Sequence, residues 1–200
     1  DGTPSIAGNF GISGGNGSDS IVFDESTSST GTTWVMSNPY GADTQDFSIA
    51  SGAFVGTYLD LESVQLLGSQ GDDIFVIDSY QNGSALSMHG NGGDDRVEMT
   101  PSTLDVAAWV TSISYLGFDG GDGFDSFYFH NDNTPSDWSY SVDDTYFRAD
   151  RLGLATYYLI FDHTTFEYLY ATRGVEPPTE VGQLPAPVIP AIDELFAAIR

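Results

Sequence analysis

The chain has 200 residues, of which 29 are acidic and only 5 are basic, and its formal net charge is −24. Nucleic acids are held by clustered lysine and arginine, and no apolar run approaches the roughly 20 residues that span a bilayer, so we expect neither a nucleic-acid partner nor membrane insertion. Cysteine is absent, which excludes disulfides and thiolate metal sites, while a hydrophobic content of 40% predicts a folded protein that offsets its charge by binding cations.

Four segments repeat one pattern along the chain, in which a turn rich in glycine and aspartate joins two short strands. They align without gaps as residues 10–23 (FGISGGNGSDSIVF), 64–77 (VQLLGSQGDDIFVI), 86–99 (LSMHGNGGDDRVEM) and 116–129 (LGFDGGDGFDSFYF). In each copy two apolar residues precede the turn and two follow it, alternating with other residues as in a half-buried strand. These positions are Phe10, Ile12, Ile21, Phe23, Val64, Leu66, Phe75, Ile77, Leu86, Met88, Val97, Met99, Leu116, Phe118, Phe127 and Phe129. One unit cannot bury such a face alone, so the repetition predicts stacked units forming a parallel β-helix, which is a solenoid.

The spacing of the turns indicates further strands between the first two units. The turns begin at Gly14, Gly68, Gly90 and Gly120, and the shortest interval is about one coil of a β-helix. In the long first interval we predict strands at residues 33–36, 46–50 and 54–59. A larger duplication relates residues 14–71 to residues 120–174, because both open with GGxGxDS and carry a tryptophan further on, Trp34 or Trp138.

The character of the sequence changes after Gly174. Residues 175–190 are rich in proline, which removes backbone donors and favours an extended linker. Residues 191–200 place apolar residues on one face of a short amphipathic helix. The predicted organisation is therefore an all-β, single-domain parallel β-helix over residues 1–174, followed by a short C-terminal proline-rich extension and a small helix.

The turns contain the residue types that an oxygen-rich cation site needs. Glycine allows backbone conformations in which carbonyl oxygens converge, and aspartate adds a carboxylate oxygen, a combination that suits calcium. The same residues also form tight turns without any metal, so both interpretations stay open.

The four turns, GGNGSD, GSQGDD, GNGGDD and GGDGFD, resemble the nonapeptide repeats of the RTX (hemolysin-type calcium-binding) family. In that family the repeats run in tandem with calcium held between successive turns, whereas here they are single and widely spaced. The resemblance implies calcium (Ca2+) as the bound metal. The implied ligands are the carboxylates of Asp19, Asp73, Asp95 and Asp125 and the carbonyl oxygens of Gly14, Gly68, Gly90 and Gly120, with Asp72, Asp94 and Asp122 as secondary candidates.

We therefore expect a non-enzymatic, calcium-binding structural or adhesive module that is secreted or displayed on the cell surface, where millimolar calcium fills weak sites. Because the end of a β-helix exposes unpaired backbone groups, end-to-end self-association into filaments is a second hypothesis. A third is the binding or processing of a carbohydrate, such as a cell-surface polysaccharide, with a lyase or a hydrolase as its enzymatic form. The sequence predicts no catalytic residue.

Overall fold

The computed structural model describes residues 8–37, 47–51, 54–78, 85–99, 115–130, 138–142, 146–151, 158–162 and 166–171. Every regular element in these ranges is a β-strand, so the all-β prediction is confirmed for them. None of the described segments forms a helix that is long and apolar enough to cross a membrane. The linker predicted at 175–190 and the helix predicted at 191–200 lie outside the described residues.

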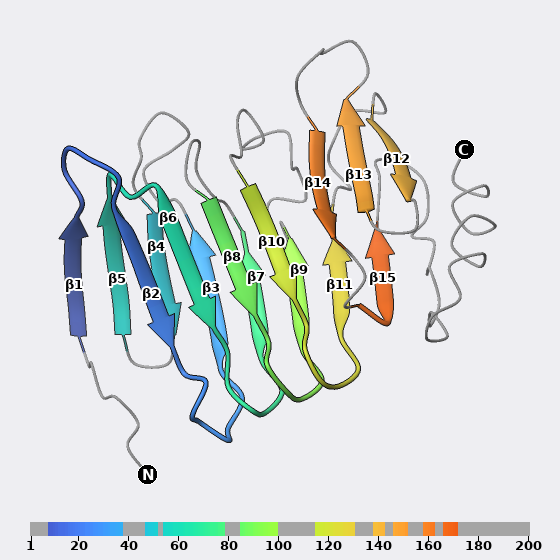
Figure 1. Cartoon of the computed structure of the whole chain (residues 1–200), viewed down its shortest axis with the longest axis horizontal. Coiled ribbons are helices and arrows are strands. Elements are labelled where there is room, and N and C mark those ends of the chain that lie inside the picture. The colour runs from blue at the N-terminus through green and yellow to red at the C-terminus, as the bar shows by residue number, and fades with distance from the viewer. Residues whose placement is uncertain are drawn as a thin grey trace.

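Two sheets lie face to face as the main layers of the protein (Figure 1). The larger has eight strands in the spatial order β1 (Gly8–Ser13), β5 (Phe54–Leu59), β4 (Phe47–Ser51), β3 (Thr33–Ser37), β7 (Ile74–Ile77), β9 (Arg96–Met99), β11 (Ser126–Phe129) and β15 (Tyr168–Ala171). The smaller has four parallel strands in the order β10 (Tyr115–Asp119), β8 (Ala85–His89), β6 (Ser63–Leu67) and β2 (Ser20–Asp24). A third, antiparallel sheet contains β12 (Trp138–Val142), β13 (Tyr146–Arg151) and β14 (Tyr158–Asp162).

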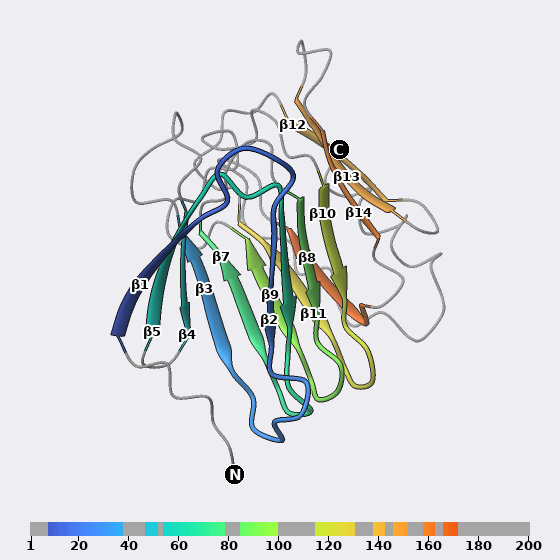
Figure 2. The same ribbon diagram turned by 60° about the vertical axis from the view of Figure 1, so that its left-hand side comes forward.

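The chain crosses repeatedly from the small sheet to the large one. The strand pairs β6 and β7, β8 and β9, and β10 and β11 each make this crossing through one of the turns, and Figure 2 shows the turns following one another along one edge. Parallel pairing is in register, so that equivalent apolar residues of successive units lie side by side: Val64 pairs with Leu86, and Leu86 pairs with Leu116. The strands that pair in the structure are therefore the equivalent strands of successive repeats in the sequence.

The space between the two sheets holds the apolar core. The twelve repeated apolar positions of the second, third and fourth units are all buried, and none of them is more than 6% exposed. Aromatic rings contact each other across this space, since the centroids of Phe75 and Phe118 are 5.6 Å apart and those of Phe118 and Phe166 are 4.8 Å apart. These twelve positions share one interior, as the alternation predicts.

The first unit departs from the predicted alignment. Its strands occupy the opposite sheets, because β1 lies in the large sheet and β2 pairs with β6 in the small one. Phe23 is held there by two rings at 5.9 and 5.4 Å, those of Trp34 and Tyr58. Ile12 remains 39% exposed, Ile21 and Phe23 are half-buried, and the side chain of Phe10 lies outside the described set.

The strands predicted between the first two units are confirmed as β3, β4 and β5. Their pairing differs from a purely parallel stack, because β4 runs antiparallel to both of its neighbours. Only two residues separate β4 from β5, which is enough for an antiparallel hairpin and too few for a parallel crossover. The prediction of parallel strands throughout was therefore wrong for this part of the large sheet.

Two adjacent leucines of β6 test whether the space between the sheets is the core. Leu66 is 0% exposed, whereas Leu67 points away from the core and is half-buried. We expect Leu66→Ala to lower the free energy of unfolding by roughly 2–5 kcal/mol, and the matched change Leu67→Ala to lower it by less than about 1 kcal/mol. Urea denaturation measures both, and equal losses would contradict the assignment of the two faces.

Candidate cation-binding corners

Three of the four predicted turns lie against each other at one edge of the protein. We call residues 68–73, 90–95 and 120–125 the corner turns. Backbone hydrogen bonds tie each one to the next unit: the Gly68 N–H donates to the His89 carbonyl oxygen (2.7 Å), and the Gly90 N–H donates to the Asp119 carbonyl oxygen (2.8 Å). Asp73, Asp95 and Asp125, which are far apart in the sequence, become neighbours in this way.

These three aspartates form a chain of hydrogen bonds that we call the carboxylate ladder. The backbone N–H of Asp73 donates to Asp95 Oδ1 (2.7 Å), and that of Asp95 donates to Asp125 Oδ1 (2.8 Å). The ladder continues at both ends, because the Thr32 N–H donates to Asp73 Oδ1 (2.6 Å) and the Asp125 N–H donates to Glu167 Oε2 (2.6 Å). Each carboxylate thus fastens one turn to the preceding one.

The ladder lies in an environment that opposes its negative charge. All three aspartates are 0% exposed. Burial is the main cause that raises the pKa of Asp95 to about 7 and that of Asp125 to about 6, and it also raises the pKa of Asp73. The ladder hydrogen bonds lower these pKa values in part, while repulsion among the carboxylates raises them further. A bound proton or a bound cation would relieve this repulsion.

The first glycine of each corner turn is required by the carboxylate that folds back on it. A Cβ atom at Gly68 would meet Asp73 Oδ2 at 2.5 Å and the carbonyl oxygens of His89 and Gly90 at 2.9 Å. At Gly90 it would meet Asp95 Oδ2 and the carbonyl oxygen of Gly120. The spacing of five residues from glycine to aspartate therefore places carboxylate and carbonyl oxygens around the same point.

The second carboxylate oxygen, Oδ2, differs among the corner turns. At Asp73 it accepts hydrogen bonds from the Ser69 N–H (2.6 Å) and from Ser69 Oγ (3.1 Å). Within the described part of the chain, the buried Oδ2 atoms of Asp95 and Asp125 have no hydrogen-bond partner. Two buried acceptors therefore lack a donor, and at Asp95 a carbonyl oxygen of the next turn lies beside the acceptor.

The secondary candidates lie on the outside of the same edge. Asp72, Asp94 and Asp122 are exposed. Asp72 and Asp94 accept a second row of bonds, in which the Asp94 N–H donates to Asp72 Oδ1 and the Phe124 N–H donates to Asp94 Oδ1, both at 2.9 Å. Their carboxylates face solvent and are separate from the buried oxygens of the ladder.

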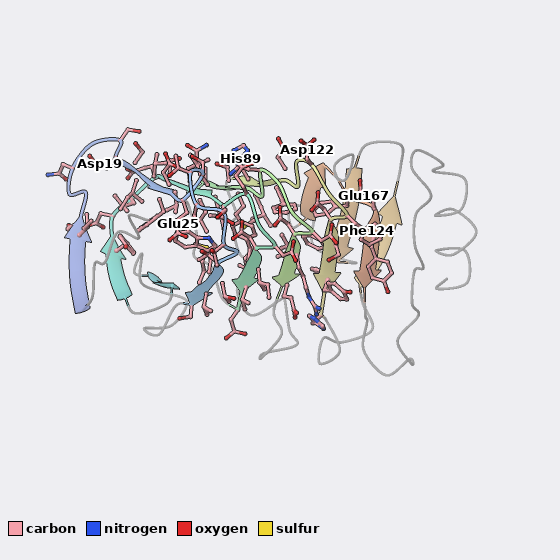
Figure 3. All side chains as sticks on the ribbon, turned by 90° about the horizontal axis from the view of Figure 1, so that it is seen from below. Asp19, Glu25, His89, Asp122, Phe124 and Glu167 are labelled. Atoms are coloured by element: carbon pink, nitrogen blue, oxygen red, sulfur yellow. The ribbon has the colours of Figure 1, made fainter. Side chains whose placement is uncertain are left out.

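Asp19 and Gly14 are not brought to the corner turns. Strand β1 runs in the same direction as β7, so the turn that follows β1 lies at the opposite edge from the turn that precedes β7 (Figure 1). In Figure 3, Asp19 lies at the far end of the protein from Phe124 and Glu167. Asp19 is half-buried, and its backbone N–H donates to Glu62 Oε2 (2.6 Å). The sequence alignment of the four turns therefore predicted the wrong neighbours for Asp19.

Two glutamates that sequence reasoning missed complete this arrangement. Glu62 accepts the Asp19 N–H and Glu167 accepts the Asp125 N–H, both at 2.6 Å. In return, the N–H of each glutamate donates to the carbonyl oxygen of its aspartate at 3.0 Å. A signal was available, since each glutamate follows a buried apolar residue, precedes a strand, and comes 43 or 42 residues after its aspartate. The duplication seen in the sequence thus extends to this hydrogen-bond pair.

The donor set of the corner turns decides which metal could fit. The described residues contain no cluster of three or more histidine, cysteine, aspartate or glutamate side chains around one point. What they offer is carboxylate oxygen together with backbone carbonyl oxygen, and calcium accepts both kinds of ligand. The orphaned oxygens of Asp95 and Asp125 therefore fit a hard cation with mixed oxygen ligands.

No protein-family model, curated protein or solved structure matches this chain. The likeness to the RTX repeats therefore depends on the residues of the turns themselves. The features of the chain that bear on its function are the geometry of the corner turns and the net charge of −24.

Proposed function

We propose that the protein is a non-enzymatic structural module of the cell exterior, a parallel β-helix whose corner turns take up calcium. The observation that carries this proposal is that two buried oxygens of the corner turns, Asp95 Oδ2 and Asp125 Oδ2, have no hydrogen-bond partner among the described residues, as is also true of Asp19 Oδ2 at the opposite edge. A buried acceptor without a donor costs free energy, and a buried carboxylate costs more. A cation at this edge turns that cost into a stabilising contact.

The residues that would hold calcium belong to successive turns. Asp95 and Asp125 would supply carboxylate oxygens, and the Gly120 carbonyl oxygen lies beside Asp95 Oδ2 at the surface of Gly90. Calcium supplies positive charge where the ladder accumulates negative charge, and it accepts more oxygen ligands than a single turn can offer. The chain's own ladder bonds hold the turns in register, so that binding requires little rearrangement.

The formal net charge of −24 supports a location where cations are plentiful. A compact chain with this charge repels itself, and screening or cation binding reduces the repulsion. Sites built from few carboxylates and several carbonyls belong to the weak, extracellular range of calcium affinity, near 10⁻⁴ to 10⁻³ M as an order of magnitude. A secreted or surface-displayed module would therefore be loaded outside the cell and unloaded inside it.

Thermal unfolding tests this proposal. We expect millimolar calcium to raise the melting temperature relative to excess EGTA, because a ligand that binds only the folded state stabilises it. Asp95→Asn combined with Asp125→Asn should abolish most of the rise. The single change Asp119→Asn, which removes one negative charge from a side chain that is 57% exposed, should leave the rise intact. An equal rise in the double variant, or no rise in the unmodified protein, contradicts the proposal.

A further inference from the structure

We infer that Ser69 takes the place of a cation at the first corner turn, so that calcium binds at the turns of Asp95 and Asp125 and not at the turn of Asp73. This inference depends on the proposed calcium uptake. The three corner turns look equivalent in the sequence, but only the second and third would need a metal.

The contacts of the serine give both oxygens of the carboxylate a donor, although the hydroxyl proton is shared with the Gly71 carbonyl oxygen at 3.0 Å. The Ser69 N–H and hydroxyl both reach Asp73 Oδ2, at 2.6 and 3.1 Å, while Asp73 Oδ1 already accepts the Thr32 N–H. The serine hydroxyl also accepts the Gly71 N–H at 3.0 Å, which fixes it within the turn. Hydrogen bonds to a buried carboxylate stabilise its charged form, which is the role that a cation would otherwise have.

The backbone of the other turns is arranged differently at the same position. Their second residues are Asn91 and Gly121, with φ of 74° and 94°, in the left-handed region that asparagine and glycine adopt most readily. Ser69 is not among the described residues with positive φ. Its N–H is therefore able to point at the carboxylate of its own turn, whereas no N–H of the described residues reaches Oδ2 of Asp95 or Asp125.

A carbonyl oxygen of the first turn is occupied as well. The side-chain amide of Asn91 donates to the Gly68 carbonyl oxygen at 2.7 Å. This bond holds the side chain of Asn91 against the first turn. The carbonyl oxygen beside Asp73 Oδ2 is that of Gly90, just as the Gly120 carbonyl oxygen lies beside Asp95 Oδ2. The first turn is thus distinguished by the protein donors to its carboxylate, Asp73 Oδ2.

Counting bound ions tests the inference on the full chain. Calcium titration calorimetry and native mass spectrometry should give one ion fewer for Asp95→Asn and one fewer for Asp125→Asn, and an unchanged number for Asp73→Asn. Loss of an ion in Asp73→Asn, with circular dichroism showing an intact fold, overturns the inference alone. Absence of calcium binding in the unmodified protein overturns the proposed function itself.

A second variant avoids any dependence on the folding of Asp73→Asn. Ser69→Ala removes the hydroxyl, so we expect its melting temperature in EGTA to fall below that of the unmodified protein by several degrees. Calcium should not restore this loss, because no ion replaces the serine. The outward-facing Ser87→Ala on β8 serves as the matched control and should show no such fall. Restoration of the Ser69→Ala melting temperature to the unmodified value by calcium overturns the inference.

Discussion

Replacing Gly90 with alanine is expected to destabilise the protein by about 3 kcal/mol or more. The new methyl group would clash with Asp95 Oδ2 and with the carbonyl oxygen of Gly120, and both atoms belong to tightly held parts of the corner. Neither can move without breaking the bond from the Asp73 N–H to Asp95 Oδ1 or the register of β10. Overpacking against a rigid backbone is among the costliest single substitutions.

The matched control lies two residues away in the same turn. A Cβ atom at Gly92 would find Gln70 Oε1 at 3.4 Å and the Asp122 carbonyl oxygen at 3.9 Å, which are ordinary contacts. Gly92→Ala should therefore change the free energy of unfolding by less than about 1 kcal/mol. Alanine also lowers the conformational entropy of the unfolded chain, which favours the folded state slightly. Urea denaturation of both variants decides the matter. Comparable losses at the two positions would contradict the fold-back of Asp95 onto Gly90.

The core and the corner turns were predictable because one period governs both. Alternation of apolar residues marks the buried face of each strand, and a constant spacing from that face to the glycine fixes where the turn begins. Val64, Leu86 and Leu116 could be assigned to one row without knowledge of the structure, and the pairing confirms that row. Local pattern and long-range pairing agree at these positions.

The first unit could not be placed from the same pattern. Its two strands alternate in the same way before and after the turn, so the sequence does not say which of them belongs to which sheet. The choice depends on partners more than thirty residues away, since Ile21 pairs with Val64 and Phe23 packs on Tyr58. Such information is absent from any single repeat, and for this reason the predicted stacking of all four units fails for the unit that contains Asp19.

The role of the aspartates in the ladder was also hidden from the sequence. Asp73, Asp95 and Asp125 were predicted as cation ligands from the chemistry of their turns. In the structure one oxygen of each is already an acceptor for the preceding turn, which leaves only the other oxygen for a ligand. This division follows from the separation of neighbouring strands, about 4.8 Å, which brings the carboxylate within hydrogen-bond reach of the next backbone. A single carboxylate thus joins stacking and cation binding.

Without calcium, the protein is expected to lose stability as the pH rises from about 4 to about 7. The pKa of Asp95 is raised to about 7 in the folded protein and lies near 3.8 in the unfolded chain, so the folded state binds the proton more tightly. The resulting stabilisation is fully present below about pH 3.8 and disappears as the pH rises through 7. A pKa difference of this size corresponds to roughly 4 kcal/mol for Asp95, and Asp125 adds to it in the same direction. Urea denaturation in EGTA across this range measures the loss.

Asp95→Asn separates this effect from the general repulsion of an acidic chain. Asparagine keeps an oxygen for the Asp73 N–H, and its amide can donate to the Gly120 carbonyl oxygen that faces the orphaned Oδ2. The variant should match the unmodified protein near pH 4, where Asp95 is protonated, and exceed it by several kcal/mol near pH 7 in EGTA. Calcium should reverse the order at pH 7, because only the carboxylate gains from the cation. If the free energy of unfolding in EGTA changed equally with pH in the two proteins, Asp95 would have to be charged in the folded state at mildly acidic pH. The buried ladder would then need another source of positive charge.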